Sequence, residues 1–192
     1  MKIESVCVCC GSSPGLLPEY LEAASKFGRL LASRGITLVY GGGKVGLMGA
    51  VADGALEAGG RVIGVIPKSL IDKKVAHTGL TELHPVSSMH ERKAKMADLS
   101  DAFVALPGGV GTLEEIFEAC TWTQLGFHSK PCAFLNVMGF YDSLFAFIHN
   151  LVAQRFLKPE HLSSLLLETD MDRLLARLQA YEHVSVDKWI DR

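Results

Sequence analysis

The sequence lacks the features that would mark a membrane protein, a secreted protein or a nucleic-acid-binding domain. Its apolar runs stay well short of the roughly 20 residues that a membrane-spanning helix needs. The N-terminal stretch MKIESVCVCCGSS has too short an apolar run and too acidic a flank for a signal peptide. The formal net charge is −2, without the basic excess of a nucleic-acid-binding domain. We therefore expect a cytoplasmic protein with no membrane or nucleic-acid partner.

The cysteines do not suit a disulfide framework, because their number is odd: the chain has five. Cys7, Cys9 and Cys10 lie close together, but no second CxxC or Cys/His pair completes the four ligands of a zinc site. In a β-strand, Cys7 and Cys9 would share one face and Cys10 would point to the other. We predict that they are small buried side chains and that the protein holds no metal.

What the sequence does contain is a regular alternation of apolar, β-rich segments with amphipathic ones. Strands are predicted over 3–9, 36–40, 61–66, 101–106, 131–137 and 164–168. Helices are predicted over 18–35, 45–60, 87–100, 111–126, 140–156 and 171–183. This order predicts an α/β fold with a doubly wound, Rossmann-like parallel sheet, in a single domain over 1–192. The irregular segment 69–86 is interpreted as a flap beside the site.

Three strand ends carry glycine-rich loops that permit close approach of a ligand to the backbone. GGGKVGLMG (41–49) contains the GxGxxG pattern of dinucleotide sites, after a predicted strand and before a helix. However, the next strand ends without the carboxylate that binds ribose, and Lys44 is not followed by the Ser or Thr of a Walker A motif. The alternatives are a mononucleotide or sugar site and a simple packing turn. With CGSSPG (10–15), this loop contributes the candidate substrate-binding residues Gly11, Ser12, Gly42 and Gly43.

The loop PGGVGT (107–112) is the stronger candidate for an anion site. Successive backbone N–H groups at a glycine turn form a nest for anions, and a following helix adds free N–H groups and its positive dipole end. The three glycines allow positive φ and close approach, and Thr112 adds a hydroxyl. If the helix begins at Gly111 and Thr112, Glu115 lies about one turn along it and can face a different part of the ligand. The alternative is a tight strand–helix turn with ordinary first-turn acids.

A basic helix precedes this loop in the chain. Ser88 and Glu91 have the spacing of a capping box, which predicts that the helix begins near Ser88. Arg92 would then fall in its first turns and could reach the same pocket, where its guanidinium would bind phosphate or carboxylate. The alternative is an exposed basic helix face shared with Lys95.

Together, GGGKVGLMG, GRVIGVIP, MHERKAKM and LPGGVGTLEE resemble the LOG (Lonely guy) family, over roughly residues 3 to 155. The members are cytokinin riboside 5'-monophosphate phosphoribohydrolases, long taken for lysine decarboxylases. The resemblance implies hydrolysis of the N-glycosidic bond of an N6-modified adenosine 5'-monophosphate, with release of the free base and ribose 5-phosphate. It also implies a homodimer and no metal or organic cofactor.

By matching position, the resemblance implies that Arg92 and Glu115 are the catalytic pair. It also implies that residues of MHERKAKM, of LPGGVGTLEE and of the helix that follows contact the substrate. They are Met89, Lys93, Gly108, Gly109, Val110, Gly111, Thr112, Leu113, Glu114 and Thr121. The sequence departs from the family at Lys74, where an acid is common, and this bears on contacts to the base.

Two other functions fit parts of the pattern. A non-catalytic nucleotide or molybdenum-cofactor binding protein would keep the glycine loops and make Glu115 dispensable. A lysine decarboxylase would need a lysine that holds pyridoxal phosphate as a Schiff base, and no lysine stands out as buried in an apolar strand or pocket.

Overall fold

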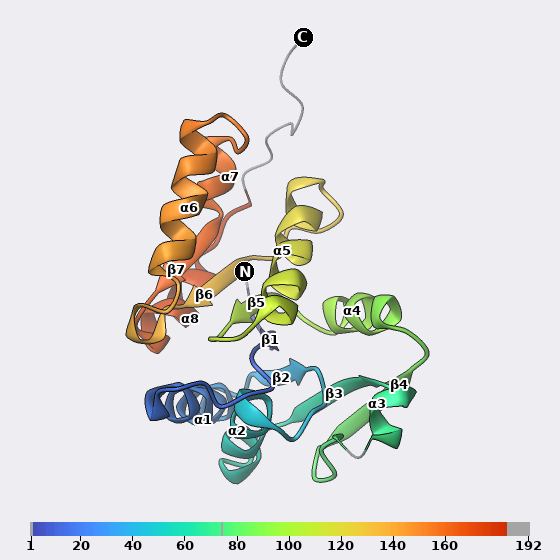
Figure 1. Ribbon diagram of the computed structural model, residues 1–192. Helices are drawn as coiled ribbons and strands as arrows, with labels where there is room; N and C mark the ends of the chain where they lie inside the picture. Colours follow the sequence, from blue (N-terminus) through green and yellow to red (C-terminus); the bar gives the residue numbers. More distant parts are fainter. Residues whose placement is uncertain (1, 74, 184–192) are drawn as a thin grey trace.

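The computed structural model describes residues 2–73 and 75–183. At its centre is a seven-stranded sheet with the strand order β4-β3-β2-β1-β5-β6-β7 (Figure 1). Every neighbouring pair of strands is parallel. The strands are β1 (Ser5–Cys9), β2 (Thr37–Tyr40), β3 (Val62–Pro67), β4 (Glu82–Val86), β5 (Ala102–Ala105), β6 (Cys132–Leu135) and β7 (Leu165–Glu168). The predicted α/β fold with a doubly wound, Rossmann-like parallel sheet is therefore confirmed.

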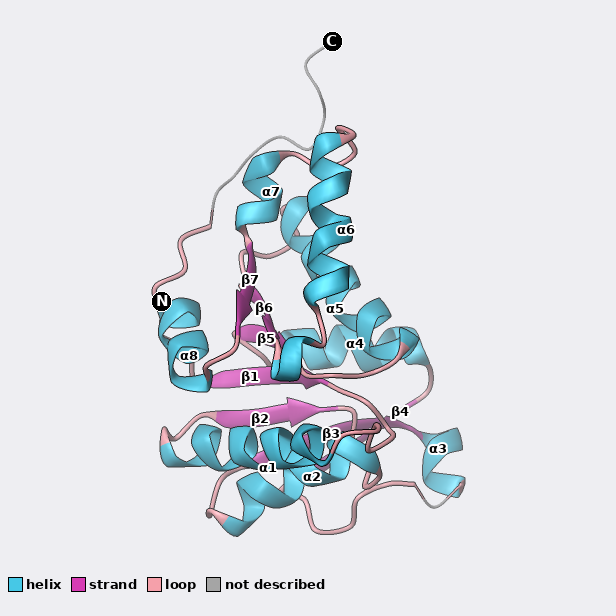
Figure 2. Cartoon of the chain, turned by 60° about the vertical axis from the view of Figure 1, so that its left-hand side comes forward, coloured by secondary structure: helices cyan, strands magenta, loops and turns pink. Residues whose placement is uncertain are grey.

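Helices cover both faces of this sheet (Figure 2). They are α1 (Pro18–Ser33), α2 (Gly46–Glu57), α3 (Lys68–Asp72), α4 (Met89–Asp98), α5 (Val110–Gln124), α6 (Asp142–Ala153), α7 (Pro159–Ser163) and α8 (Met171–Gln179), with a 3₁₀ turn at Val137–Gly139. One apolar core joins the sheet to α1, α2 and α8, and a second joins it to α4, α5 and α6. Because both faces are covered, the strands can be apolar at nearly every position.

The side chains of β1 show how the chain divides between the two cores. Val6 and Val8 pack with α1 and α2, whereas Cys7 and Cys9 face the core under α4 and α5. Cys10, just beyond the strand, joins the first core. The five cysteines are free and buried, which confirms the prediction of small buried side chains.

The segment predicted to be an irregular flap contains regular structure. It holds the short helix α3 and the edge strand β4, which pairs only with β3. Its sequence, ELHPV, has polar residues and a proline at Pro85, which is unusual inside a sheet. A proline is tolerated at an edge, because its missing N–H faces no further strand. The β-propensity of its residues therefore does not predict this strand.

Between α3 and β4 the chain returns to the glycine loop that follows β2. Gly43 and Ala76 form an antiparallel bridge. The N–H of Lys44 donates to the carbonyl of Val75 at 2.9 Å, and the N–H of His77 donates to the carbonyl of Gly42 at the same distance. These bonds hold the described part of the segment against the loop. Lys74, where the sequence departs from the family, lies outside the described residues.

Candidate active site

The glycine loops after β1 and β5 meet at the topological switch point of the sheet. The chain winds outward from β1 to β4 and then returns to β5 on the other side of β1. The two loops touch here, since the N–H of Gly11 donates to the carbonyl of Pro107 at 3.0 Å. Open α/β sheets bind ligands outside the carboxyl ends of the strands at such a point.

A pocket of about 590 Å³ opens at these strand ends. Its lining includes many of the residues predicted to form the site: Gly11, Ser12, Gly43, Arg92, Gly109, Val110, Gly111, Thr112 and Glu115. They come from the loops after β1, β2 and β5 and from the first turns of α4 and α5. The fold therefore assembles segments that lie about a hundred residues apart into one wall.

Arg92 reaches the pocket because α4 begins where the capping box predicts. Ser88 is the N-cap, and its hydroxyl accepts from the N–H of Glu91 at 3.1 Å. The Glu91 carboxylate accepts from the N–H of Ser87 instead of closing on Ser88. Arg92 is 8% exposed, so the exposed basic face considered as an alternative does not form.

The guanidinium of Arg92 is held on two sides. Its Nε donates to the carbonyl of Val65 at 3.1 Å, and its Nη1 lies 3.0 Å from Glu115 Oε1. A Cβ on Gly41 would lie 1.6 Å from Arg92 Nη2. Gly41 is thus required by close approach, because any side chain there would expel the guanidinium.

Glu115 is a largely buried carboxylate opposite Arg92. Burial raises its pKa above the usual range, and the positive charge of Arg92 and a hydrogen bond with the Cys9 thiol oppose that rise. The raised pKa brings this carboxyl closer to the pH at which a general base works best. Arg92 and Glu115 therefore present to the pocket a carboxylate that can act as a base.

The loop before α5 differs from the expectation in two details. The helix begins at Val110 with Gly109 as its N-cap, one residue earlier than predicted. None of the three glycines of PGGVGT has a positive φ. Gly108 is needed for close approach inside the protein, since a Cβ there would lie 2.1 Å from Thr112 Oγ1. Gly109 and Gly111 would meet no atom within 4 Å, so their backbone faces open space.

Several predicted contacts do not line the large pocket. Met89 lies beside it, with its sulfur 3.9 Å from Arg92 Nη1. Gly108 lines a neighbouring cavity of about 310 Å³, which Tyr20 and Phe140 also line. Lys93 points to the other side of Glu115 and pairs with Glu114 and Glu118. The remaining predicted contacts that are absent from the lining are Gly42, Leu113, Glu114 and Thr121.

The pocket also has an apolar wall that sequence reasoning missed. Its members come from β1, from the loop and helix after β2, from the end of β3, and from α3 and the segment after it: Val8, Cys10, Val45, Met48, Ile66, Leu70 and Val75. For Val8, Cys10 and Ile66, the position at or just after a strand end was the available signal. In sequence they cannot be told from core residues, because both are apolar.

Comparison with known proteins shows the family to which this chain belongs. Residues 48–178 match the family model described as "Possible lysine decarboxylase". A probable cytokinin riboside 5'-monophosphate phosphoribohydrolase of Oryza sativa subsp. japonica, LOGL9, is 49% identical over 94% of this chain and 79% of its own length. The cytokinin riboside 5'-monophosphate phosphoribohydrolase of Rhodococcoides fascians is 47% identical over 92% and 90%, and LOG7 of Arabidopsis thaliana is 46% identical over 94% and 83%. This chain belongs to the LOG family.

Solved structures extend the likeness of this LOG-family chain in fold alone. The molybdenum cofactor binding protein of Rippkaea orientalis has a TM-score of 0.70 at 23% identity, covering 94% of this chain and 98% of its own. The molybdenum cofactor carrier protein of Chlamydomonas reinhardtii has a TM-score of 0.70 at 22% identity, covering 93% and 97%. At such identities the shared sheet says nothing about the ligand.

The description of the family model raises the question of a lysine that could hold pyridoxal phosphate. Among residues 2–73 and 75–183, no lysine lines the large pocket. The side chain of Lys93 is only 10% exposed, but its ammonium is paired with two carboxylates. Burial alone would lower the pKa of Lys93, yet hydrogen bonds to Glu114 and Glu118 raise it. A paired, protonated amine does not form a Schiff base, so the described residues of this LOG-family chain do not fit that cofactor.

The described residues contain neither a metal-binding cluster nor a helix that could span a membrane. Within 2–73 and 75–183, three or more His, Cys, Asp or Glu side chains nowhere gather as a metal site would require. In the same part of this LOG-family chain, no helix combines the length and apolar character that crossing a membrane demands.

Proposed function

We propose that this protein hydrolyses the N-glycosidic bond of N6-modified adenosine 5'-monophosphates and of AMP, releasing the free base and ribose 5-phosphate. The observation that carries the proposal is the buried Arg92–Glu115 pair, 3.0 Å apart, beside a glycine loop that opens a helix. The relatives named as cytokinin riboside 5'-monophosphate phosphoribohydrolases, at 46–49% identity, support the same reaction.

The start of α5 supplies a seat for the 5'-phosphate. Free backbone N–H groups and the positive end of the helix dipole favour an anion at this position. The open space over Gly109 and Gly111 lets phosphate oxygens approach the backbone directly. The phosphate takes no part in the reaction. Its binding energy would position the ribose for the reaction at C1'.

Glu115 would act on the sugar carbon that bears the base. Breaking the ribosyl C–N bond builds positive charge on the ribose, as in glycoside hydrolysis. The carboxylate stabilises that charge and takes a proton from the attacking water. The water oxygen bonds to C1', the C–N bond breaks, and its electron pair leaves with the base, which gains a proton. Arg92 keeps Glu115 oriented toward the pocket through their ion pair.

The direct test is base release from purified protein. Incubation with AMP and with N6-isopentenyladenosine monophosphate, followed by chromatography, should show free base and ribose 5-phosphate. The Glu115→Gln variant keeps the shape of the side chain but removes its charge, so it should lose turnover and still bind nucleotide. Near-normal turnover in this variant would remove Glu115 from the mechanism.

A non-catalytic binding protein is the alternative. It predicts that nucleotide or molybdenum cofactor binds without base release, and that Glu115→Gln changes nothing measurable. The likeness to molybdenum cofactor binding proteins is one of fold, at 22–23% identity, and does not favour it over hydrolysis. Wild-type protein that binds these nucleotides but releases no base would support the alternative.

The proposed assembly is a homodimer in the cytoplasm, with a small nucleotide as the substrate. Light scattering of the purified protein tests the assembly, since a monomer has a mass of 20.8 kDa. Kinetics on AMP and on the N6-prenylated nucleotide, measured side by side, test the substrate. A preference for the prenylated nucleotide would fit the apolar wall formed by Val45, Met48 and Leu70.

A further inference from the structure

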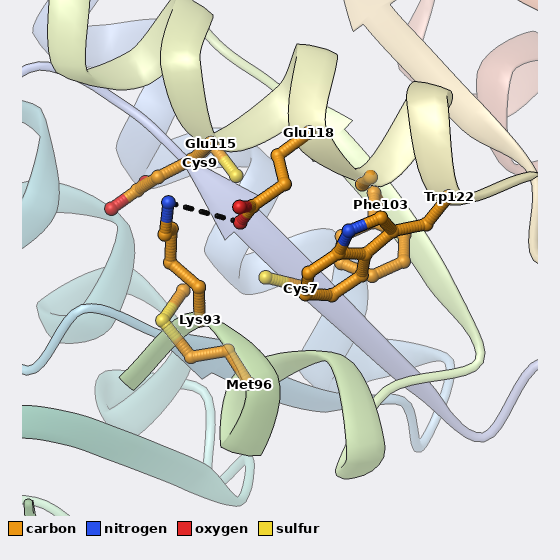
Figure 3. Close-up of a pocket in the computed structure, with 9 residues that line it drawn as sticks. Cys7, Cys9, Lys93, Met96, Phe103, Glu115, Glu118 and Trp122 are labelled. Carbon is orange, nitrogen blue, oxygen red and sulfur yellow. Dashed lines mark ion pairs between the residues drawn. The ribbon is translucent and has the colours of Figure 1, made fainter. Parts of the chain in front are cut away.

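A second, much smaller cavity lies next to Glu115, away from the large pocket. Its volume is about 10 Å³, close to the space that one water molecule needs. Glu115 lines both cavities. The small one is otherwise lined by Cys7, Cys9, Lys93, Met96, Phe103, Glu118, Ala119 and Trp122 (Figure 3). The candidate catalytic carboxylate thus shares a narrow, mostly apolar space with a lysine.

Lys93 is placed there by two ion pairs with α5. Its ammonium lies 3.0 Å from Glu118 Oε2 and also contacts Glu114 Oε1, while its side chain is only 10% exposed. In the view of Figure 3 the ammonium lies between the carboxylates of Glu115 and Glu118. Glu114, Glu115 and Glu118 would otherwise crowd three negative charges onto little more than one turn of helix.

The charges around Glu115 come from three elements. Arg92 and Lys93 approach from α4, and Glu114 and Glu118 share α5 with it. The β1 strand and its end present the thiols of Cys7, Cys9 and Cys10, of which Cys9 is hydrogen-bonded to Glu115. Burial and the charge of Glu114 raise the pKa of Glu115, whereas Arg92 and, less strongly, Lys93 lower it. Because burial already favours the protonated carboxyl, removing the positive charge of Lys93 should favour protonation further.

We propose that Lys93 is a positioning residue: by pairing with Glu114 and Glu118 beside the small cavity, it keeps Glu115 ionised and in place for catalysis. This inference rests on the proposed function, since it assigns Glu115 a role as an ionised base. It differs from a substrate contact, because Lys93 does not line the large pocket. A neutral side chain at position 93 would leave two carboxylates unpaired next to Glu115 and favour its protonation.

The pH profile of kcat/KM separates these roles. In Lys93→Met, the acid limb should move to higher pH by about one unit, the effect of losing a nearby opposite charge. Below the limb this lowers kcat/KM about tenfold, with recovery at high pH and little change in KM. Glu118→Gln removes a negative charge from the same cluster, so its acid limb should move to lower pH. Lys93→Arg should keep the wild-type limb.

Lys95→Met is the matched control, because it removes a lysine from the same helix outside this cluster. It should leave the limb in place. If Lys93→Met raises KM at every pH with an unmoved limb, Lys93 contacts the substrate and the proposal is wrong. A uniform loss of activity with a lower melting temperature, and no shift in Glu118→Gln, would reduce Lys93 to a structural role.

The titration of Glu115 can also be read without turnover. The ¹³C resonance of its carboxyl, assigned with Glu115→Gln, should titrate at higher pH in Lys93→Met than in the wild type and at lower pH in Glu118→Gln. If the wild type releases no base, the proposed function fails, yet these shifts still test the charge arrangement. Unshifted titrations in both variants would overturn the positioning role even in an active enzyme.

Discussion

Replacing Gly111 with alanine should separate ligand binding from folding, because the two effects have opposite signs. Gly111 is the second residue of α5 and lines the large pocket. Its φ is not positive, and a Cβ there would meet no atom within 4 Å. Neither backbone strain nor packing therefore requires glycine at this position, whereas a phosphate at the backbone N–H groups would.

The magnitudes follow from those two facts. Alanine is favoured over glycine inside a helix by roughly 0.5–1 kcal/mol, which in a domain of this size raises the melting temperature by about 1–4 °C. A methyl group that blocks one hydrogen bond between phosphate and backbone removes about 1.5–3 kcal/mol. Since about 1.4 kcal/mol is a factor of ten, kcat/KM should fall about 10- to 150-fold.

The assay is kcat/KM for AMP and its N6-prenylated form, together with a thermal melt of the same preparation. The matched control is the corresponding nucleoside, which lacks the 5'-phosphate. Wild type and Gly111→Ala should differ little on the nucleoside and strongly on the nucleotide. If the melting temperature rises while kcat/KM for the nucleotide stays within about twofold of wild type, the phosphate does not sit against this helix start.

Two further substitutions test the neighbourhood of the site. Gly41→Ala places a Cβ 1.6 Å from Arg92 Nη2, so the guanidinium must leave Glu115. We expect kcat/KM to fall at least ~100-fold, as for loss of a catalytic orienting group, with the fold retained. Wild-type kinetics in this variant would contradict the geometry. Burial lowers the pKa of His128 to about 4, below the ~6.5 of an unfolded chain. The unfolded state therefore binds this proton first, and stability at pH 7 is lost as the pH falls from about 6.5 toward 4. In His128→Asn, denaturant melts should show a shallower loss over that range, and an unchanged slope would refute the assignment.

Much of the fold could be predicted because its signals are local. The apolar runs of β1, β2 and β3 and the helical spacing between them predict a parallel sheet with helices on both faces. The spacing of Ser88 and Glu91 predicts where α4 begins, because a capping box acts within one turn. β4 could not be predicted in this way. Its stability comes from pairing with β3 at the edge, which no local propensity records.

The candidate site, like the fold, could be predicted from the sequence only in part. The motifs around Arg92 and Gly109 could be identified from sequence, and so could the family. The distance between Arg92 and Glu115, the burial of both, and the close approach of Gly41 depend on how α4 and α5 pack beside β1 and β3. The direction in which the Lys93 side chain points is the clearest example of a feature that the sequence did not predict. It follows Arg92 directly, so sequence reasoning placed both in one pocket.

The sequence by itself therefore determined the order of the elements, the position of the glycine loops and the residue types available for chemistry. Successive residues on a helix point about 100° apart, and so Arg92 and Lys93 reach opposite sides of Glu115 once α4 packs against α5. Only the tertiary structure decided that Arg92 faces the large pocket while Lys93 pairs with Glu114 and Glu118 beside the small cavity. The environment of Glu115, and with it the protonation of that carboxyl, is a property of this packing.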